Sequence, residues 1–113
     1  MKEHNYFVYI TTNPNRSVLY TGVTNDLERR ITEHYLNRGN KTTFTGRYYA
    51  YCLVYYERYQ HIYDAIDGEK EIKGWVRQKK EELITEENPR WRFLNEEVCS
   101  CWPPPGSSTE TDR

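Results

Sequence analysis

Two short segments near the N-terminus, YFVYITT at residues Tyr6–Thr12 and VLYTG at residues Val18–Gly22, decide the fold. Both are rich in the β-branched and aromatic residues that favour strands. The residues between them, NPNRS at 13–17, are typical of a turn. The sequence therefore predicts an antiparallel hairpin that carries one tyrosine near the middle of each strand, Tyr9 and Tyr20.

A helix is predicted directly after the hairpin, from about Asp26 to Leu36. Asn25 followed by Glu28 resembles a helix N-cap with its capping-box partner. The residues 37–46 lack periodicity and contain two glycines, so we expect a polar loop there. Apolar residues recur with helical spacing through the predicted helix: Leu27, Ile31 and Tyr35.

The rest of the chain predicts one more strand and further helices. Tyr48–Glu57 is a third segment of high β propensity. From Ile62 to about Ile84 the apolar spacing is helical, with Gly68 and Gly74 as positions where this helix bends or divides. A short helix is predicted from Pro89 to Leu94. The expected fold class is α/β of the α+β type, a three-stranded antiparallel sheet flanked by helices.

Size and composition indicate one small domain. The 113 residues suffice for a single core, and 11 tyrosines indicate that much of the buried area comes from rings with a polar tip. A mean hydropathy of -1.01 is low. Proline, serine and threonine dominate from Pro103 onward, so we expect a domain over residues 1–98 and a flexible tail over residues 99–113.

The charge balance excludes one general mode of binding. The net charge is -1 and the isoelectric point is about 6.3, so the whole molecule is not attracted to nucleic acid or to an anionic membrane. A local basic flank between residues 27 and 58 is one interpretation of the charge pattern, and a solvated face is the other. Its cations are Arg29, Arg30, Arg38, Lys41, Arg47 and Arg58.

Three cysteines, Cys52, Cys99 and Cys101, form no disulfide framework, because their number is odd. No apolar signal segment precedes the first strand, so we expect a reducing, cytoplasmic location. A metal site at Cys99 and Cys101 lacks a second ligand pair at zinc-like spacing.

Two polar residues one turn apart, Arg30 and His34, border the apolar stripe of the first predicted helix. A structural interpretation pairs Arg30 with Glu33 and places His34 at the helix end. With Tyr9 and Tyr20 nearby, the same residues instead indicate a reaction centre.

The second predicted helix carries a carboxylate, Glu69, within its apolar row. Because a buried, unpaired carboxylate is costly, Glu69 needs a cation, a hydrogen-bond donor or a metal as partner. A structural ion pair with Lys73 is the alternative. Glu71 is expected to face solvent.

These residues and their order resemble the GIY-YIG nuclease superfamily. Phe7-Val8-Tyr9 stands where the family has its first triplet, and Tyr20-Thr21-Gly22 matches the second triplet. Arg30 and His34 match the helix residues of the family. The resemblance is greatest to its small stand-alone members, which are similar to the N-terminal domain of excinuclease C.

The later part of the chain continues this resemblance. Glu69 matches the metal-binding glutamate of the family, and Asn88-Pro89-Arg90-Trp91 resembles the closing motif of the stand-alone group. The resemblance implies a metal-dependent endonuclease that hydrolyses DNA phosphodiesters, in repair or recombination, with Mg²⁺ or Mn²⁺ at Glu69. Either Tyr9 or Tyr20 would be the base.

The resemblance also implies roles for the cations and for one glycine. Arg30 would hold the scissile phosphate, and His34 would position phosphate or leaving group. Gly22 would leave room for the substrate. Four further side chains are expected to contact DNA. They are Arg29, Arg38, Lys41 and Arg47. The protein alone is expected to bind DNA weakly, so a homodimer or a partner protein would strengthen the binding. No role at a membrane is expected.

The sequence departs from the family pattern at three positions. Phe7 replaces the glycine of the first triplet, and Thr21 replaces the isoleucine of the second. Val23 stands where the excinuclease branch has a lysine that assists the tyrosine, and Lys41 is a candidate substitute. Two other functions therefore stay open: a non-catalytic nucleic-acid-binding module, and an interaction module that uses exposed tyrosines in the stretch Tyr48–Tyr59.

Overall fold

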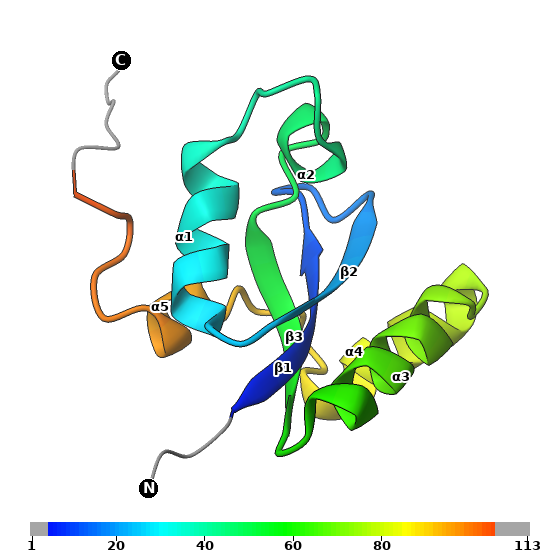
Figure 1. Ribbon diagram of the computed structural model, residues 1–113. Coiled ribbons are helices and arrows are strands. Elements are labelled where there is room, and N and C mark those ends of the chain that lie inside the picture. The colour runs from blue at the N-terminus through cyan, green and yellow to red at the C-terminus, as the bar shows by residue number, and fades with distance from the viewer. Residues whose placement is uncertain (1–4, 106–113) are drawn as a thin grey trace, which may run out of the picture.

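The fold is a three-stranded antiparallel sheet with helices on both sides (Figure 1), as the sequence predicts. The computed structural model describes residues 5–105. The strands are β1 (Tyr6–Thr12), β2 (Leu19–Thr24) and β3 (Cys52–Tyr59), in the order β2-β1-β3. The bounds of β1 match the prediction, whereas β2 and β3 each begin and end later than predicted.

The helices agree with the sequence in the first half of the chain better than in the second. They are α1 (Leu27–Leu36), α2 (Phe44–Arg47), α3 (Ile62–Lys73), α4 (Arg77–Glu87) and α5 (Asn95–Val98). The helix predicted from residue 62 divides at Gly74, one of the two glycines at which the sequence predicted a bend or division, whereas Gly68 lies within α3.

Three local predictions were wrong. The N-cap of α1 is Asp26, whose side chain accepts from the backbone N–H of Arg29, and not Asn25. The loop predicted at residues 37–46 ends in α2, because Thr43 caps a short helical turn. The predicted helix at residues 89–94 does not form; Trp91 has a φ of 52°, and α5 begins only afterwards.

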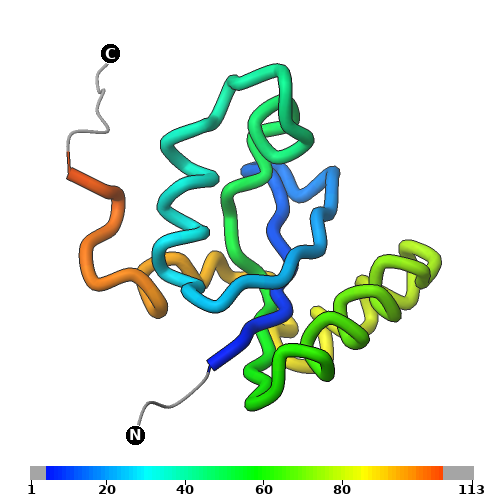
Figure 2. The backbone as a smooth tube through the Cα atoms, in the orientation of Figure 1, coloured from blue at the N-terminus to red at the C-terminus, as the bar shows by residue number. Residues whose placement is uncertain are grey.

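The alternation of side chains along β1 divides the core into two layers. Val8 and Ile10 pack with Ala65 and Ile72 of α3, whereas Tyr9 packs with Ile31 of α1. Figure 2 shows α1 on one side of the sheet and the pair of α3 and α4 on the other. Tyr9 therefore projects from the central strand into the layer that contains α1.

Two buried asparagines satisfy polar backbone groups of β3, which is an edge strand. Asn95 accepts from the backbone N–H of Leu53 at 2.9 Å, and Asn88 donates to the backbone oxygen of Val54 at 3.0 Å. Buried backbone groups need such partners. Asn88, the first residue of the closing motif, thus connects β3 to the segment that follows α4.

Residues 99–105 pack against α1, which differs from the flexible tail expected from residue 99. Cys99 is buried, and both the N–H and the hydroxyl of Ser100 donate to Glu28 at 2.8 Å. The ring centroids of Trp102 and Tyr35 lie 4.9 Å apart. An edge-to-face aromatic contact and two charge-assisted hydrogen bonds therefore attach this segment, while residues 106–113 of the predicted tail lie outside the described residues.

No helix within residues 5–105 is long and apolar enough to cross a membrane.

Candidate active site

The centre of the candidate site is Tyr9, a fully buried tyrosine whose hydroxyl has polar partners. The hydroxyl is hydrogen-bonded to Nε2 of His34 at 2.9 Å and to the guanidinium of Arg30. Burial and the neighbouring Tyr20 raise the pKa of Tyr9 above its ordinary value, although Arg30 acts in the opposite direction. Tyr9 is therefore a neutral phenol that connects a strand to the helix α1.

His34 lies one turn after Arg30 on α1 and is neutral at pH 7. Burial and the positive charge of Arg30 lower its pKa to about 4. Its ring centroid lies 5.8 Å from that of Tyr9 and 5.7 Å from that of Tyr20. The structural interpretation, in which His34 only interacts with the end of its helix, does not account for these contacts, because the imidazole ring contacts both tyrosines.

Arg30 is held from two sides. Its Nε lies 3.3 Å from a carboxylate oxygen of Glu33, the pair that the structural interpretation expected, and its guanidinium also bonds to Tyr9. Burial lowers the pKa of Arg30, but Tyr9 and Glu33 outweigh this effect and raise the pKa. About 40% of the side chain is exposed, so this fixed cation is still accessible to an anion.

Gly22 makes room for Tyr9. The two residues face each other in the β1–β2 register, and a Cβ at Gly22 would lie 2.5 Å from both Cζ and the hydroxyl oxygen of Tyr9. The sequence predicted that this glycine leaves space for the substrate. The space is instead filled by the tyrosine ring, so glycine is required here by packing.

A surface pocket of about 260 Å³ opens beside this cluster. Arg30 and His34 lie on one side of it, and Tyr20 of β2 lines it together with Phe44 of α2. The ring centroids of Tyr9 and Tyr20 are 6.3 Å apart. The pocket therefore brings an accessible tyrosine, a cation and a neutral imidazole to one opening.

Glu69 approaches the cluster from α3. Its carboxylate is only 12% exposed, and Oε2 lies 2.7 Å from Nζ of Lys73, so the ion pair that the sequence offered as the structural alternative does form. The negative charge of Glu69 is near enough to contribute to the raised pKa of Tyr9. Nζ of Lys73 also lies 5.9 Å from the ring centroid of Tyr20.

The residues around Glu69 fit one kind of metal site. Within residues 5–105, no group of three or more His, Cys, Asp or Glu side chains is arranged to hold a metal ion. Cys99 and Cys101 therefore belong to no such group. Mg²⁺ is usually held by one or two carboxylates and keeps several waters. The Glu69 carboxylate already stabilises a positive charge, the Lys73 ammonium, so a single carboxylate for a hydrated divalent ion is chemically consistent.

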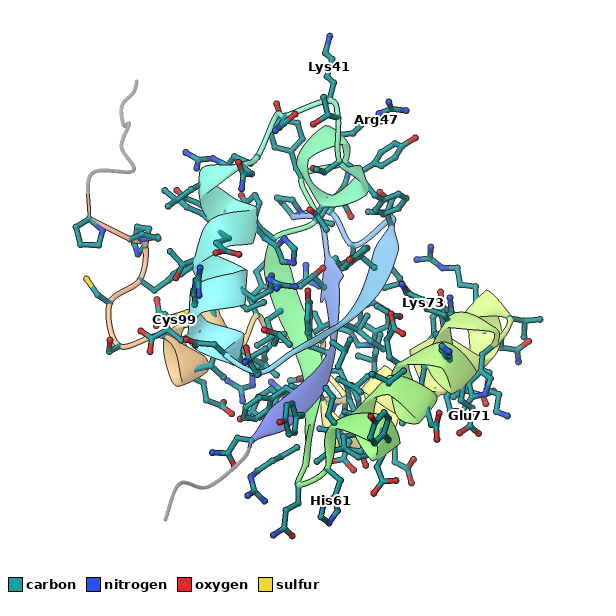
Figure 3. The ribbon with its side chains drawn as sticks, viewed as in Figure 1. Lys41, Arg47, His61, Glu71, Lys73 and Cys99 are labelled. Atoms are coloured by element: carbon teal, nitrogen blue, oxygen red, sulfur yellow. The ribbon has the colours of Figure 1, made fainter. Side chains whose placement is uncertain are left out.

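The other predicted DNA-contacting residues lie outside this pocket. Arg29 pairs with Glu33 at 3.1 Å, and Arg38 lies over the ring of Tyr35. Lys41 and Arg47 project outward near α2 (Figure 3), so Lys41 does not substitute for the missing lysine at Val23. None of these four cations is among the residues that line the pocket.

Two residues of the site have no role that the sequence alone assigns. The sequence offers Lys73 only as a structural partner of Glu69, yet its ammonium also lies near Tyr20. Phe44 belongs to the predicted loop. Phe44 could have been noticed because it is the one aromatic residue in the polar stretch 37–46. Lys73 could have been noticed because it lies four residues after Glu69, on the same face of the helix.

The fold is a small α+β domain that carries this polar cluster beside a surface pocket. Residues 5–82 match the family described as the GIY-YIG catalytic domain. The chain belongs to this family, a family of nuclease-type domains, and the resemblance predicted from the two triplets is thereby confirmed.

Several relatives carry the name UPF0213 protein. One from Haloquadratum walsbyi is 38% identical over 81 residues, which cover 72% of this chain and 88% of the relative. One from Staphylococcus aureus is 41% identical over 81 residues, which cover 72% of this chain and 95% of the relative. The solution NMR structure of a UPF0213 protein from Bacillus halodurans has a TM-score of 0.49 and 28% identity, covering 84% of this chain and 98% of that chain.

Proposed function

We propose that this protein is a metal-dependent endonuclease that hydrolyses phosphodiester bonds in DNA, with a role in repair or recombination. The observation that carries the proposal is the convergence of Arg30, His34 and Tyr20 on one surface pocket. Glu69 does not line this pocket, but its negative charge contributes to the raised pKa of Tyr9. Its partner Lys73 lies near the ring of Tyr20. Apart from Lys73, each of these residues stands at a position that the GIY-YIG resemblance assigns to the site.

Arg30 is proposed to bind the scissile phosphate. Its bonds to Glu33 and Tyr9 hold the guanidinium in place while about 40% of the side chain stays accessible. A planar, permanently charged fork matches the oxygens of a phosphate. Because the cation is fixed before substrate binds, it can stabilise the charge that accumulates in the transition state without reorganisation.

Tyr20 is proposed as the base: its phenolate, formed when the phenol loses its proton to solvent at the open pocket, accepts the proton of the attacking water and becomes the neutral phenol again. Tyr9 is fully buried, and burial raises its pKa, so it is shielded from water and is a weak acid. Tyr20 lines the pocket, and the Lys73 ammonium lies 5.9 Å from its ring, where it attracts negative charge. Val23 stands where the excinuclease branch has a lysine that assists the tyrosine, and Lys73 would supply this positive charge instead.

His34 and Tyr9 are proposed to position the other groups. The neutral imidazole of His34 contacts both tyrosine rings and lines the pocket. In this state it can exchange hydrogen bonds with phosphate or leaving group without adding charge. Tyr9 fixes the orientation of His34 through their hydrogen bond of 2.9 Å.

Glu69 is the proposed ligand of a divalent ion, Mg²⁺ or Mn²⁺, which when bound supplies Lewis-acid stabilisation of the phosphate and leaving oxygens. For this, the carboxylate must exchange the Lys73 ammonium for the ion, and the half-exposed side chain of Lys73 can move aside. The single carboxylate leaves most positions of the ion to water and phosphate.

DNA cleavage by the purified protein tests the proposal. Supercoiled plasmid and branched DNA are incubated in Mg²⁺ or Mn²⁺ with wild type, Glu69→Gln and the control Glu71→Gln, whose carboxylate faces solvent (Figure 3). We expect Glu69→Gln to lose about 100-fold or more, the equivalent of about 3 kcal/mol in the barrier. Equal rates for wild type and Glu69→Gln would contradict the assignment, and a preference for branched DNA would support the role in repair or recombination.

The Glu69–Lys73 ion pair favours one alternative, a non-catalytic nucleic-acid-binding module of the same fold. In that case the ion pair has only a structural role, and Lys73 prevents the Glu69 carboxylate from binding a metal ion. This alternative predicts DNA binding without cleavage by the wild type, and undiminished binding by Glu69→Gln.

A further inference from the structure

A row of exposed aromatic rings lies beside the pocket. Phe44 and Tyr48 flank the α2 turn, and 46% and 43% of these residues are exposed. The Phe44 ring is stacked with that of Tyr20 at a centroid distance of 6.0 Å and an interplanar angle of 27°, and it lies 4.8 Å from that of Tyr48. We call these three rings the aromatic row.

The turn that carries Phe44 is held tightly in place. The Thr43 hydroxyl accepts from the N–H of Gly46, and the N–H of Gly39 donates to the oxygen of Gly46 at 2.8 Å. A Cβ at Gly46 would lie 2.4 Å from the backbone oxygen of Asn40, so only glycine permits this docking. The aromatic row is therefore presented by a fixed element, and its exposure does not come from a loosely packed loop.

The pocket next to the aromatic row has two different sides. Phe44 and Tyr20 supply flat apolar rings, whereas His34 supplies a polar imidazole and Arg30 a positive charge that is paired with Glu33 at the same opening. Its volume of about 260 Å³ is below the roughly 300–1,000 Å³ of pockets for drug-sized ligands. A single planar group attached to an anion matches this combination of size, shape and charge.

We propose that this pocket binds one unpaired nucleobase, stacked on Phe44, next to the phosphate that Arg30 holds. The inference rests on the proposed function and specifies its substrate. A base inside a duplex must first be unpaired and flipped out, which costs free energy, so an already unpaired base enters a pocket of this kind far more readily. Stacking on an aromatic ring tolerates any base, because every base has a π face. The preferred substrate is therefore DNA with at least one unpaired nucleotide beside the cleaved bond.

Fluorescence of 2-aminopurine tests this proposal without catalysis. The probes are a DNA duplex with one bulged 2-aminopurine, the same duplex with an abasic bulge, and a fully paired duplex, each bound by the full chain in EDTA. The variants are Phe44→Ala, Phe44→Leu and Phe44→Trp. Tyr63→Ala is the matched control, because Tyr63 is an exposed aromatic residue on α3 outside the pocket.

We expect the wild type to change the 2-aminopurine emission and to prefer the bulged over the paired and abasic duplexes. Loss of one stacked base costs roughly 5- to 150-fold in affinity. Phe44→Ala and Phe44→Leu should lose this preference, whereas Phe44→Trp and Tyr63→Ala should keep it. Circular dichroism confirms that each variant is folded.

Two results would overturn the proposal in distinguishable ways. If Phe44→Ala weakens the binding of all three probes equally, or if the wild type shows no preference for the bulged base, the base pocket is wrong and the proposed nuclease function still stands. If no probe binds, the proposed function fails, and the base pocket fails with it.

Discussion

The two sides of the site are built differently. On the α1 side, Tyr9, Arg30 and His34 are connected by hydrogen bonds and by ring contacts. On the α3 side, Glu69 is paired with Lys73, a residue of its own helix, at 2.7 Å. The first side presents a cation fixed among packed side chains, whereas the second side pairs its carboxylate with a cation of the same helix.

This difference indicates how each half responds to change. A packed cluster around a fully buried ring is sensitive to volume, because interiors are close-packed. The Glu69–Lys73 pair has one partner, Lys73, that is half-exposed and flexible, and exposed ion pairs of flexible side chains typically contribute below about 1 kcal/mol. We therefore expect substitutions on the α1 side to damage the site strongly and substitutions of Lys73 to adjust it.

Gly22→Ala should produce the largest effect, on both stability and cleavage rate. The new Cβ would lie 2.5 Å from the Tyr9 ring, so the ring must move away from His34. Overpacking of this kind costs about 1–3 kcal/mol in the free energy of unfolding, and a displaced catalytic group can cost about 100-fold in rate. Thermal unfolding and plasmid cleavage measure the two quantities.

A second glycine provides the control for this substitution. At Gly74 a Cβ would meet its nearest atom at 3.5 Å, an ordinary contact, so Gly74→Ala should leave rate and stability nearly unchanged. If Gly22→Ala is tolerated as well as Gly74→Ala, the description of the α1 side as tightly assembled is wrong.

Lys73→Met should have a moderate effect, on metal affinity. Without the ammonium, Glu69 has no internal cation to exchange, and Mn²⁺ should bind about 2- to 5-fold more tightly, as expected for loss of a half-exposed ion pair. Isothermal titration calorimetry measures the affinity. Lys70→Met removes the same charge from an exposed neighbouring position and serves as the control. Equal affinities in the two variants would show that Lys73 does not compete for Glu69.

Stability should also depend on pH because of His34. Its pKa is about 4 in the folded protein and about 6.5 when unfolded, so the unfolded chain binds the proton first as the pH falls. Stability from the neutral imidazole is complete above pH 6.5 and declines toward pH 4. Melting temperatures across this range should fall more steeply for wild type than for His34→Gln. Parallel curves would contradict the lowered pKa.

The sequence predicted the parts of this site that lie within regular strands and helices. Tyr9 was placed by the β propensity of its segment, and Arg30 and His34 by helical spacing, which fixes the side chains that share a helix face. Phe44 and the packed segment after Val98 were not predicted. Their positions depend on a capped turn and on tertiary contacts to α1, which leave no periodic pattern in the sequence.

The role of Gly22 shows the same limit. A glycine in a strand indicates a close approach, but the sequence does not reveal which atom approaches. The structure identifies the Tyr9 ring. The ion pair of Glu69 was available from sequence spacing, whereas the nearness of Lys73 to Tyr20 required the arrangement of α3 beside β2.

Paramagnetic broadening by Mn²⁺ tests most directly whether Glu69 and the tyrosines form one metal-dependent site. In NMR spectra of the wild type, substoichiometric Mn²⁺ should broaden the signals of Tyr9, Tyr20 and His34 first. The same signals should stay sharp in Glu69→Gln at equal Mn²⁺. Broadening centred elsewhere, for example on the acidic end of α4, or broadening of the tyrosines that is unchanged in Glu69→Gln, would contradict the account.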